Sequence, residues 1–340
     1  MASPSTLASC ARVFKRWKEP ALDMLWMDIS DLHVLFQLLA PMELDDGTWK
    51  FSSAETPLQW DRFDYYAEKL HRFEYKNAED DGDDEDEDAP PLGISEDTWT
   101  TIARVRRHLP LLPKLTFLQW QSIHTTDILL FLSPSLMELK LIIRQFPPQI
   151  TGHHSFCFGQ LLQQCATKSP GLKKFILQTQ LNILMVQNEL SSFLQSLPGL
   201  EMIMLPYFTP RSHQLLTAIS HLPNLRRLET LVWSSVIKEI PPIDNTLFDG
   251  TFPALTEVDL HTQLDDIQHV LQNPNFPCTL KTLVIRSVPP ITSFLLWNMI
   301  SQVSKLNILK DCSSTSARLH LQLRKCRTTM FLYCSKPYHQ

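Results

Sequence analysis

The sequence has few of the residues that most enzyme signatures require. Only eight glycines occur among 340 residues, and neither a G-x-x-x-x-G-K-[ST] loop nor a G-x-G-x-x-G turn is present. Without such a loop no segment is expected to hold a nucleotide phosphate. The G-x-S-x-G motif of serine hydrolases is also missing. His153 and Cys157 have no second pair of ligands and do not predict a metal site. We therefore expect a non-catalytic protein with no cofactor and no metal ion.

Long apolar runs and paired cysteines are lacking as well. No stretch approaches the roughly 20 apolar residues of a membrane helix, and the first residues contain no apolar core of signal-peptide length. The seven cysteines are odd in number and contain no C-x-x-C pair, which favours a reducing compartment. We expect a soluble intracellular protein, cytoplasmic or nuclear, with no membrane partner.

An excess of basic charge is absent too. The formal net charge is -5, and residues 79 to 88 (EDDGDDEDED) alone hold nine acidic groups, so the rest of the chain is close to neutral. Non-specific binding to phosphate backbones requires a strongly basic field. The sequence therefore predicts no nucleic-acid partner.

A short strand pattern recurs nine times between Leu70 and Leu306. Five copies read Pro-x-Leu-x-x-apolar-x-apolar, and they begin at Pro113, Pro134, Pro170, Pro198 and Pro253. Four less complete copies begin at Leu70, Leu225, Leu280 and Leu306. The first anchors are 21 to 45 residues apart, and most spacings lie near the roughly 20–29 residues of leucine-rich repeats.

Amphipathic helices are expected between the strands, over 126–132, 156–167, 189–196, 212–222, 265–272 and 292–303, with Ser212 as an N-cap. One strand and one helix cannot bury their apolar faces alone, so the repeats are expected to stack with parallel strands. The predicted fold class is α/β, a leucine-rich-repeat solenoid over residues 70–311, followed by an irregular basic tail at 312–340. The alternative is an ordinary α/β domain whose strands are alike by chance.

The acidic run lies between the first strand copy, Leu70 to Tyr75, and a helix predicted over 95–109 with Ser95 as its N-cap. It is therefore interpreted as part of a disordered loop, 77–92, inside one repeat. Such an insertion is tolerated because loop closure costs only ~0.6 kcal/mol per doubling of length. A docking site for a basic partner is the other interpretation.

Side chains that alternate with the apolar anchors are predicted to point out of the concave sheet face. The candidate binding residues are Phe117, Gln119, Lys140, Lys174, Met202, Met204, Arg227, Glu257 and Asp259. This set runs from mixed through apolar to acidic, which predicts a protein partner with a hydrophobic centre. The alternative is a sheet face that contacts only water.

Residues 1–41 follow helical rather than strand spacing. Three short helices are expected: one from Leu7 to Trp17, one opened by Pro20 and running through Trp26, and one near 31–39. Residues 42–69 are predicted to be a connecting helix region that leads into the repeats.

The N-terminal text resembles a known family. TLASCARVFKRWKEPALDMLWMDISDLHVLFQLLAP is similar to the second half of the F-box in fungal F-box/leucine-rich-repeat proteins, and QWDRFDYYAEKLHRFEY resembles the stretch that enters their first repeat. The resemblance implies a non-catalytic substrate-recognition subunit of an SCF-type ubiquitin ligase. Its F-box would bind the Skp-type adaptor, and its repeats would bind the protein to be ubiquitinated. The residues matched to F-box positions that pack its helices or face the adaptor are Leu7, Val13, Trp17, Leu25 and Trp26.

The chain departs from the F-box pattern in one respect. The Leu-Pro-x-Glu-[Ile/Leu] helix that opens an F-box has no counterpart before Leu7. A gene model that lacks a first exon, a diverged product and a protein that kept only its recognition half are the three explanations. The alternative function is a stand-alone leucine-rich-repeat scaffold that binds proteins without the adaptor.

Overall fold

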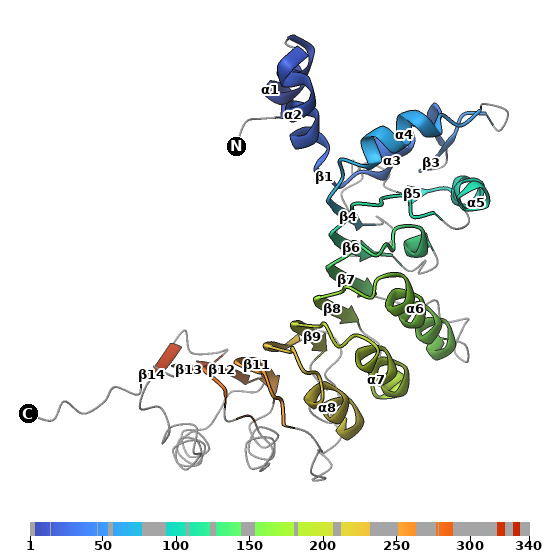
Figure 1. Ribbon diagram of the computed structural model, residues 1–340. Coiled ribbons are helices and arrows are strands. Elements are labelled where there is room, and N and C mark those ends of the chain that lie inside the picture. The colour runs from blue at the N-terminus through green and yellow to red at the C-terminus, as the bar shows by residue number, and fades with distance from the viewer. Residues whose placement is uncertain are drawn as a thin grey trace, which may run out of the picture. The chain divides into compact units, whose positions relative to one another are not determined.

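The computed structural model describes residues 4–13, 15–45, 47–53, 57–76, 93–106, 109–122, 127–143, 154–179, 183–206, 212–231, 251–262, 277, 279–287, 318–323 and 329–333 (Figure 1). The chain divides into two compact units. Unit 1 is Met1–Thr151 with Gln163–Leu172, and unit 2 is Gly152–Leu162 with Lys173–Gln340.

Unit 1 contains four neighbouring parallel strands, in the order β1 (Asp28–Ile29), β4 (Arg72–Lys76), β6 (Phe117–Gln121) and β7 (Glu138–Ile143). The second anchors Phe73, Leu118 and Leu139 lie opposite one another in the register, and all three are fully buried. Side chains alternate between the two faces of a strand, so these anchors place one face of the sheet in the core.

Helices cover the anchor side of the unit 1 sheet: α3 (Leu32–Phe36), α4 (Trp60–Ala67), α5 (Glu96–Val105) and the 3₁₀ helix η2 (Asp127–Leu130) (Figure 1). Trp99 of α5 lies 6.2 Å from Trp120, between ring centroids, and Trp120 lies 5.4 Å from Phe131. Large rings bury much apolar area and favour such tilted and edge contacts. The core of unit 1 therefore contains a cluster of aromatic rings among its buried leucines and isoleucines.

A second small sheet lies in the part of unit 1 predicted to be only a connecting helix region. Strands β2 (Met42–Asp45) and β3 (Thr48–Phe51) form an antiparallel hairpin, and β5 (Gly93–Ile94) pairs parallel with β3. Gly47 has φ of 76° in the hairpin turn, a conformation that favours glycine. The prediction for 42–69 was incomplete, because strands this short with no fully buried side chain leave little hydrophobic periodicity.

Unit 2 contains six parallel strands: β8 (Lys174–Thr179), β9 (Met202–Pro206), β10 (Arg227–Leu231), β11 (Glu257–Thr262), β12 (Thr282–Ser287) and β13 (Arg318–Leu323). A final strand, β14 (Thr329–Tyr333), pairs antiparallel with β13. The second anchors again form one buried row, and its members are Phe175, Ile203, Leu228, Val258 and Leu283.

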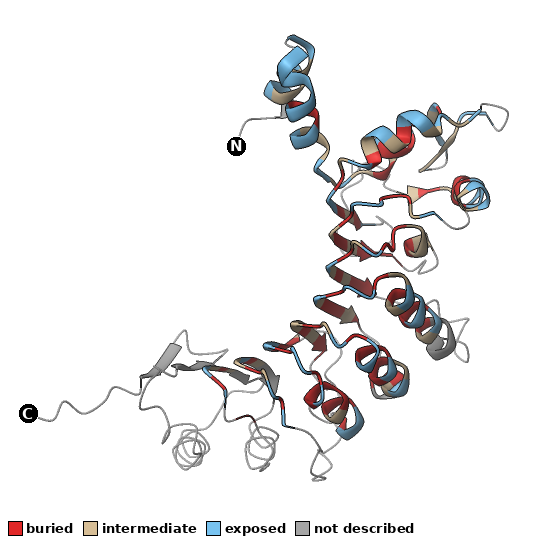
Figure 2. Cartoon of the chain, in the orientation of Figure 1, coloured by how far each residue is buried: buried red, intermediate tan, exposed pale blue. Residues whose placement is uncertain are grey.

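Three helical segments of unit 2 follow its strands: η4 (Ile183–Val186), α7 (Gln187–Gln195) and α8 (His213–Ser220). Helix α6 (His154–Lys168) begins in unit 2 and ends in unit 1. The faces of α7 and α8 toward the strands are buried and their outer faces are exposed (Figure 2). Helix α8 buries Leu215, Leu216 and Ile219, and Leu222 just after it is buried too, so the amphipathic pattern predicted there is confirmed.

The recurring proline has a structural reason. In all five complete copies the residue before the proline accepts a backbone hydrogen bond from the first-anchor leucine three residues later, at 3.1 to 3.3 Å. Proline has the φ that the second position of such a turn requires. The turn therefore sets where each strand begins.

Most of the predicted elements are confirmed. The eight strand copies between Leu70 and Ile285 coincide with β4 and β6 to β12, while the copy at Leu306 lies outside the described residues. Helices predicted over 156–167, 189–196 and 212–222 are α6, α7 and α8, whereas 126–132 contains a 3₁₀ helix. Those at 265–272 and 292–303, together with the acidic loop 77–92, lie outside the described residues. The α/β class with a large parallel sheet is thus confirmed.

Both predicted N-caps are confirmed. The hydroxyl of Ser95 accepts from the backbone N–H of Thr98 at 3.3 Å, and that of Ser212 accepts from the backbone N–H of Leu215 at 3.1 Å. Each cap satisfies one of the amide groups that the first helical turn leaves without an internal partner.

Two predictions near the ends of the chain are wrong. Helix α1 (Pro4–Val13) is followed by α2 (Lys15–Trp26), so Pro20 lies inside a helix rather than opening one. The residues around Pro20 on α2 are exposed, so water can reach the carbonyl that proline cannot bond. The tail predicted to be irregular contains β13 and β14. RLHLQL in β13 alternates leucine with polar residues, which is itself a strand signal.

None of the described helices is long and apolar enough to cross a membrane.

Candidate functional site

The first candidate surface lies on helices α1 and α2. Among their described side chains only Ala21 and Leu22 are buried, whereas Val13 is 77% and Trp17 61% exposed (Figure 2). We call Val13, Trp17 and Met24, which is 53% exposed, the helical surface. Large apolar side chains exposed on a helix pair make it a candidate protein-docking surface.

Helix α2 is attached to α4 by a network of hydrogen bonds. Lys69 Nζ donates to Asp23 at 2.6 Å and to Glu19 at 3.1 Å, and the Tyr65 hydroxyl donates to Glu19 at 2.8 Å. The bonds from Tyr65 and Lys69 lower the pKa of the Glu19 carboxyl. Burial alone would lower the pKa of Lys69, but its hydrogen bonds to Asp23 and Glu19 outweigh burial, so that pKa is raised.

The five predicted F-box positions fall into two groups. The ring of Trp26 packs 4.4 Å from that of Tyr66, measured between centroids, so Trp26 holds α2 against α4. Leu7 and Leu25 are half-buried, while Val13 and Trp17 are exposed. Sequence reasoning could not separate packing residues from exposed ones. The contact of Trp26 and the exposures of the other four residues separate them.

The second candidate surface is the unit 1 sheet face, which we define as the outward residues of β4, β6 and β7. One row is Arg72, Phe117 and Glu138, and the next is Glu74, Gln119 and Lys140. The Arg72 guanidinium carbon lies 3.5 Å from the Phe117 ring centroid and is also ion-paired with Glu74 at 2.6 Å. Phe117 was predicted to be exposed, but it is buried because Arg72 stacks on it.

The third candidate surface is the unit 2 sheet face, formed by the outward residues of β8 to β12. One row is Lys174, Met202, Arg227, Glu257 and Thr282, and the next is Ile176, Met204, Glu229, Asp259 and Val284. The register brings together the six residues predicted on these strands. Thr282 and Val284 were missed, although their alternation with the Leu283 anchor is the signal that finds them.

Exposure and charge change along the unit 2 sheet face. Met202 and Met204 of β9 are half-buried, while Arg227 and Glu257 are exposed. The Arg227 guanidinium donates a short hydrogen bond to Glu229 and lies 3.6 Å from a Glu257 carboxylate oxygen. Two carboxylates, those of Glu229 on β10 and Glu257 on β11, thus lie near the same arginine on this face.

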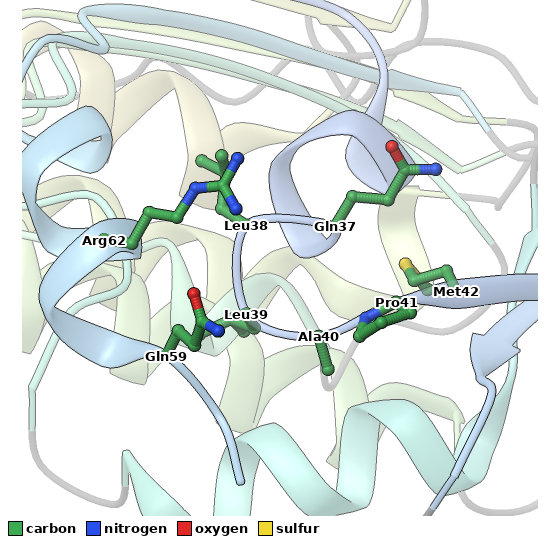
Figure 3. Close-up of a pocket in the computed structure, with 8 residues that line it drawn as sticks. All are labelled: Gln37, Leu38, Leu39, Ala40, Pro41, Met42, Gln59 and Arg62. Atoms are coloured by element: carbon green, nitrogen blue, oxygen red, sulfur yellow. The ribbon is translucent and has the colours of Figure 1, made fainter. Parts of the chain in front are cut away.

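A hollow of about 380 Å³ lies beside the C-terminal end of α3 and the start of α4 (Figure 3). Its floor includes the buried Leu38, Leu39 and Ala40, and the exposed side chains of Gln37, Gln59 and Arg62 surround it. Sequence reasoning did not single out this place. Arg62 is the one charged residue among those that line it.

Metal ligands and the buried cysteine Cys165 were the remaining candidates for chemistry among the described residues. No group of three or more His, Cys, Asp or Glu side chains able to hold a metal ion occurs among them. Cys165 is fully buried, and burial raises the pKa of its thiol to about 12. A thiol with so high a pKa is not a nucleophile at neutral pH.

No family model and no curated protein matches the chain. The F-box and leucine-rich-repeat resemblance therefore rests on the residues themselves.

Proposed function

We propose that the protein is a leucine-rich-repeat substrate-recognition subunit of an SCF-type ubiquitin ligase. In this proposal the helical surface binds a Skp-type adaptor, and the unit 2 sheet face binds the protein to be ubiquitinated. The protein itself supplies binding and no catalytic residue. The observation that carries the proposal is the exposure of Val13 on α1 and of Trp17 on α2, a helix that is held to Tyr65 of α4 and to Lys69 by hydrogen bonds that Glu19 and Asp23 accept.

Repetition of one backbone contact supports the repeat assignment. At each step two consecutive backbone N–H groups donate to a single carbonyl of the preceding strand segment, at 2.7 to 3.1 Å. Unit 1 has three such pairs, accepted by Met27, His71 and Thr116, and unit 2 has four, accepted by Lys173, Glu201, Arg226 and Thr256. Equivalent units that each contact only their neighbours are typical of a solenoid.

Residues of the helical surface also support the adaptor role. Trp17 and Val13 are both large apolar residues exposed to water, and tryptophan is enriched at the energetic centre of protein interfaces. Trp26 is not assigned to the helical surface, because its contact with Tyr66 makes it part of the fold.

The deciding experiment is co-expression of the full chain with a Skp-type adaptor, followed by size-exclusion chromatography. We expect the two proteins to elute together, and the double substitution Val13→Asp with Trp17→Asp to separate them. The control is Met185→Asp, because Met185 is 76% exposed on η4 in unit 2. Wild-type chains that elute without the adaptor would contradict the ligase role and leave a stand-alone binding scaffold.

A further inference from the structure

We propose that the hollow between the end of α3 and the start of α4 binds a carboxylate that is attached to a short branched apolar group. In this proposal the guanidinium of Arg62 binds the carboxylate, and the buried side chains of Leu38 and Leu39 contact the apolar group. The C-terminal residue of a peptide and a free branched-chain acid share this chemistry. The proposed function does not use the hollow, so this inference goes beyond it and does not depend on it.

Backbone hydrogen bonds fix the walls of the hollow. The N–H of Gln59, the N-cap residue of α4, donates to the carbonyl of Leu39 at 2.9 Å. The N–H of Ser52, just after β3, donates to the carbonyl of Pro41 at 3.0 Å. These bonds join the segment 37–42 both to the start of α4 and to the hairpin of β2 and β3. The hollow is therefore pre-formed, and its volume of about 380 Å³ lies within the range of about 300–1,000 Å³ usual for small-ligand sites.

Recognition in the hollow depends on side chains rather than on the backbone of its floor. The N–H groups of residues 38–40 donate to carbonyls of α3 at 2.9 to 3.3 Å, so a ligand finds them already bonded. Arg62 and Gln59 reach from the start of α4 toward this loop (Figure 3). Within the described part of the chain, the side chains of Gln37, Gln59 and Arg62 make no hydrogen bond or ion pair. Three exposed polar groups thus surround an apolar floor.

The charge of Arg62 is not neutralised along its own helix. Ion pairs on a helix form between residues three or four positions apart. The residues at these distances from Arg62 are not acidic: they are Leu58, Gln59, Tyr65 and Tyr66. Asp61 does not line the hollow, since successive helical residues point about 100° apart. The guanidinium therefore keeps its charge for a ligand.

The other carboxylates of the neighbouring elements already have cationic partners. Glu43 of β2 lies 3.6 Å from the Lys50 ammonium of β3. The remaining pairs are Asp31 with His33 before and in α3, and Asp64 of α4 with Arg106. These pairs leave Arg62 as the charged group that a ligand in the hollow meets.

One guanidinium above an apolar floor favours a carboxylate over a phosphate. The parallel N–H groups of a guanidinium match either anion. A phosphate carries about two negative charges and would leave part of its charge uncompensated beside the buried Leu38 and Leu39. A carboxylate is neutralised by Arg62 alone. The carboxamides of Gln37 and Gln59 each offer donors and an acceptor, which suits a peptide group next to the carboxylate.

The test is saturation-transfer NMR on the full-length chain with N-acetyl-L-leucine, which has a carboxylate, a branched apolar side chain and one peptide group. We expect transfer to its methyl protons. N-acetyl-L-leucinamide, in which a neutral amide replaces the carboxylate, should bind at least about tenfold more weakly. Arg62→Glu should weaken the binding of N-acetyl-L-leucine by at least about tenfold as well.

The matched control is Arg104→Glu, which makes the same change of charge at an exposed position of α5 that does not line the hollow. This variant should bind N-acetyl-L-leucine as the wild type does. Circular dichroism checks that both variants are folded, as expected for exposed positions.

The probe 4-methylpentanoate separates the two sources, because it has the acid and the branched group but no peptide group. Weaker binding than that of N-acetyl-L-leucine supports a peptide C terminus, and equal or tighter binding supports a free acid. The proposal is overturned by absence of transfer from the wild-type chain, by equal binding of the amide, or by unchanged binding in Arg62→Glu. Inorganic phosphate that binds more tightly than N-acetyl-L-leucine also overturns it. None of these results alters co-elution with the adaptor, so the two proposals fail separately.

Discussion

The outward sheet faces of the two units differ although their inward faces are built alike. Both units bury a row of second anchors and repeat the same backbone contact between strands. On the unit 1 face, Arg72 covers Phe117 and is itself paired with Glu74. On the unit 2 face, Met202 and Met204 stay half-exposed, and the carboxylates gather on β10 and β11.

The inward anchors form the core in both units, and the units differ at the outward residues of their strands. The anchors alternate with the outward residues, so a change at an outward position leaves the core untouched. On the unit 1 face the apolar ring of Phe117 is covered by Arg72, whereas on the unit 2 face Met202 and Met204 are only half-buried. Substitutions at the anchors, at the two arginines and at Glu19 of α2 test this difference between the units.

The largest effect is expected at the anchors, where the two units should respond equally. Phe73 and Phe175 are fully buried, and their rings lie 5.3 Å from Phe131 and 4.8 Å from Phe193 respectively. Phe73→Ala and Phe175→Ala should each lower the free energy of unfolding by about 3–5 kcal/mol, because each leaves a cavity. Urea denaturation followed by circular dichroism measures both. A loss under about 1 kcal/mol for one of them would show that its anchor row is not a packed core.

A smaller effect, and a difference between the units, is expected at the arginines. Arg227→Ala leaves the buried carboxylate of Glu229 without its donor, which costs about 1–3 kcal/mol. Arg72→Ala removes a contact on an aromatic ring and exposed ion pairs, worth about 0.5–1 kcal/mol. Arg227→Ala should therefore be the more destabilising variant in the same urea assay. The double variant Arg227→Ala with Glu229→Gln should recover part of the loss, and equal costs at the two arginines would contradict the contrast between the faces.

Sequence alone predicted the strands far better than the surfaces. The proline turn and the two-residue alternation are local signals, so β6 to β9 and β11 could be placed from Pro113, Pro134, Pro170, Pro198 and Pro253. The stacking of Arg72 on Phe117 could not be predicted in this way, because Arg72 lies 45 residues away in the chain and the contact depends on strand pairing. The hairpin of β2 and β3 was missed for a similar reason: its strands are short and partner each other rather than the core.

The same limit applied to the F-box positions. Trp17 and Trp26 are both large apolar residues nine positions apart in the helical N-terminal text, and nothing local separates them. The partner of Trp26 is Tyr66 on α4, which only the folded chain brings near. The predicted solenoid and the adaptor role remain proposals that the experiments above decide.

The smallest effect is expected in the attachment of α2 to α4, and it should depend on pH. The folded-state pKa of Glu19 is lowered from its ordinary value of 4.5 by hydrogen bonds from Tyr65 and Lys69. A lowered pKa means that the attachment is fully present above pH 4.5 and weakens as the pH falls through the lowered value. The raised pKa of Lys69 adds no change in this range, because Lys69 stays protonated throughout. Trp26 contacts Tyr66, so the part of the intrinsic fluorescence that Trp26→Phe removes should report the release of α2 at acid pH before the anchors of either unit unfold. Glu19→Gln should remove this acid transition while leaving the urea midpoint of the rest of the chain unchanged. An acid transition that persists in Glu19→Gln would assign it to other carboxylates, with Asp23, which also accepts from Lys69, as the next to be replaced.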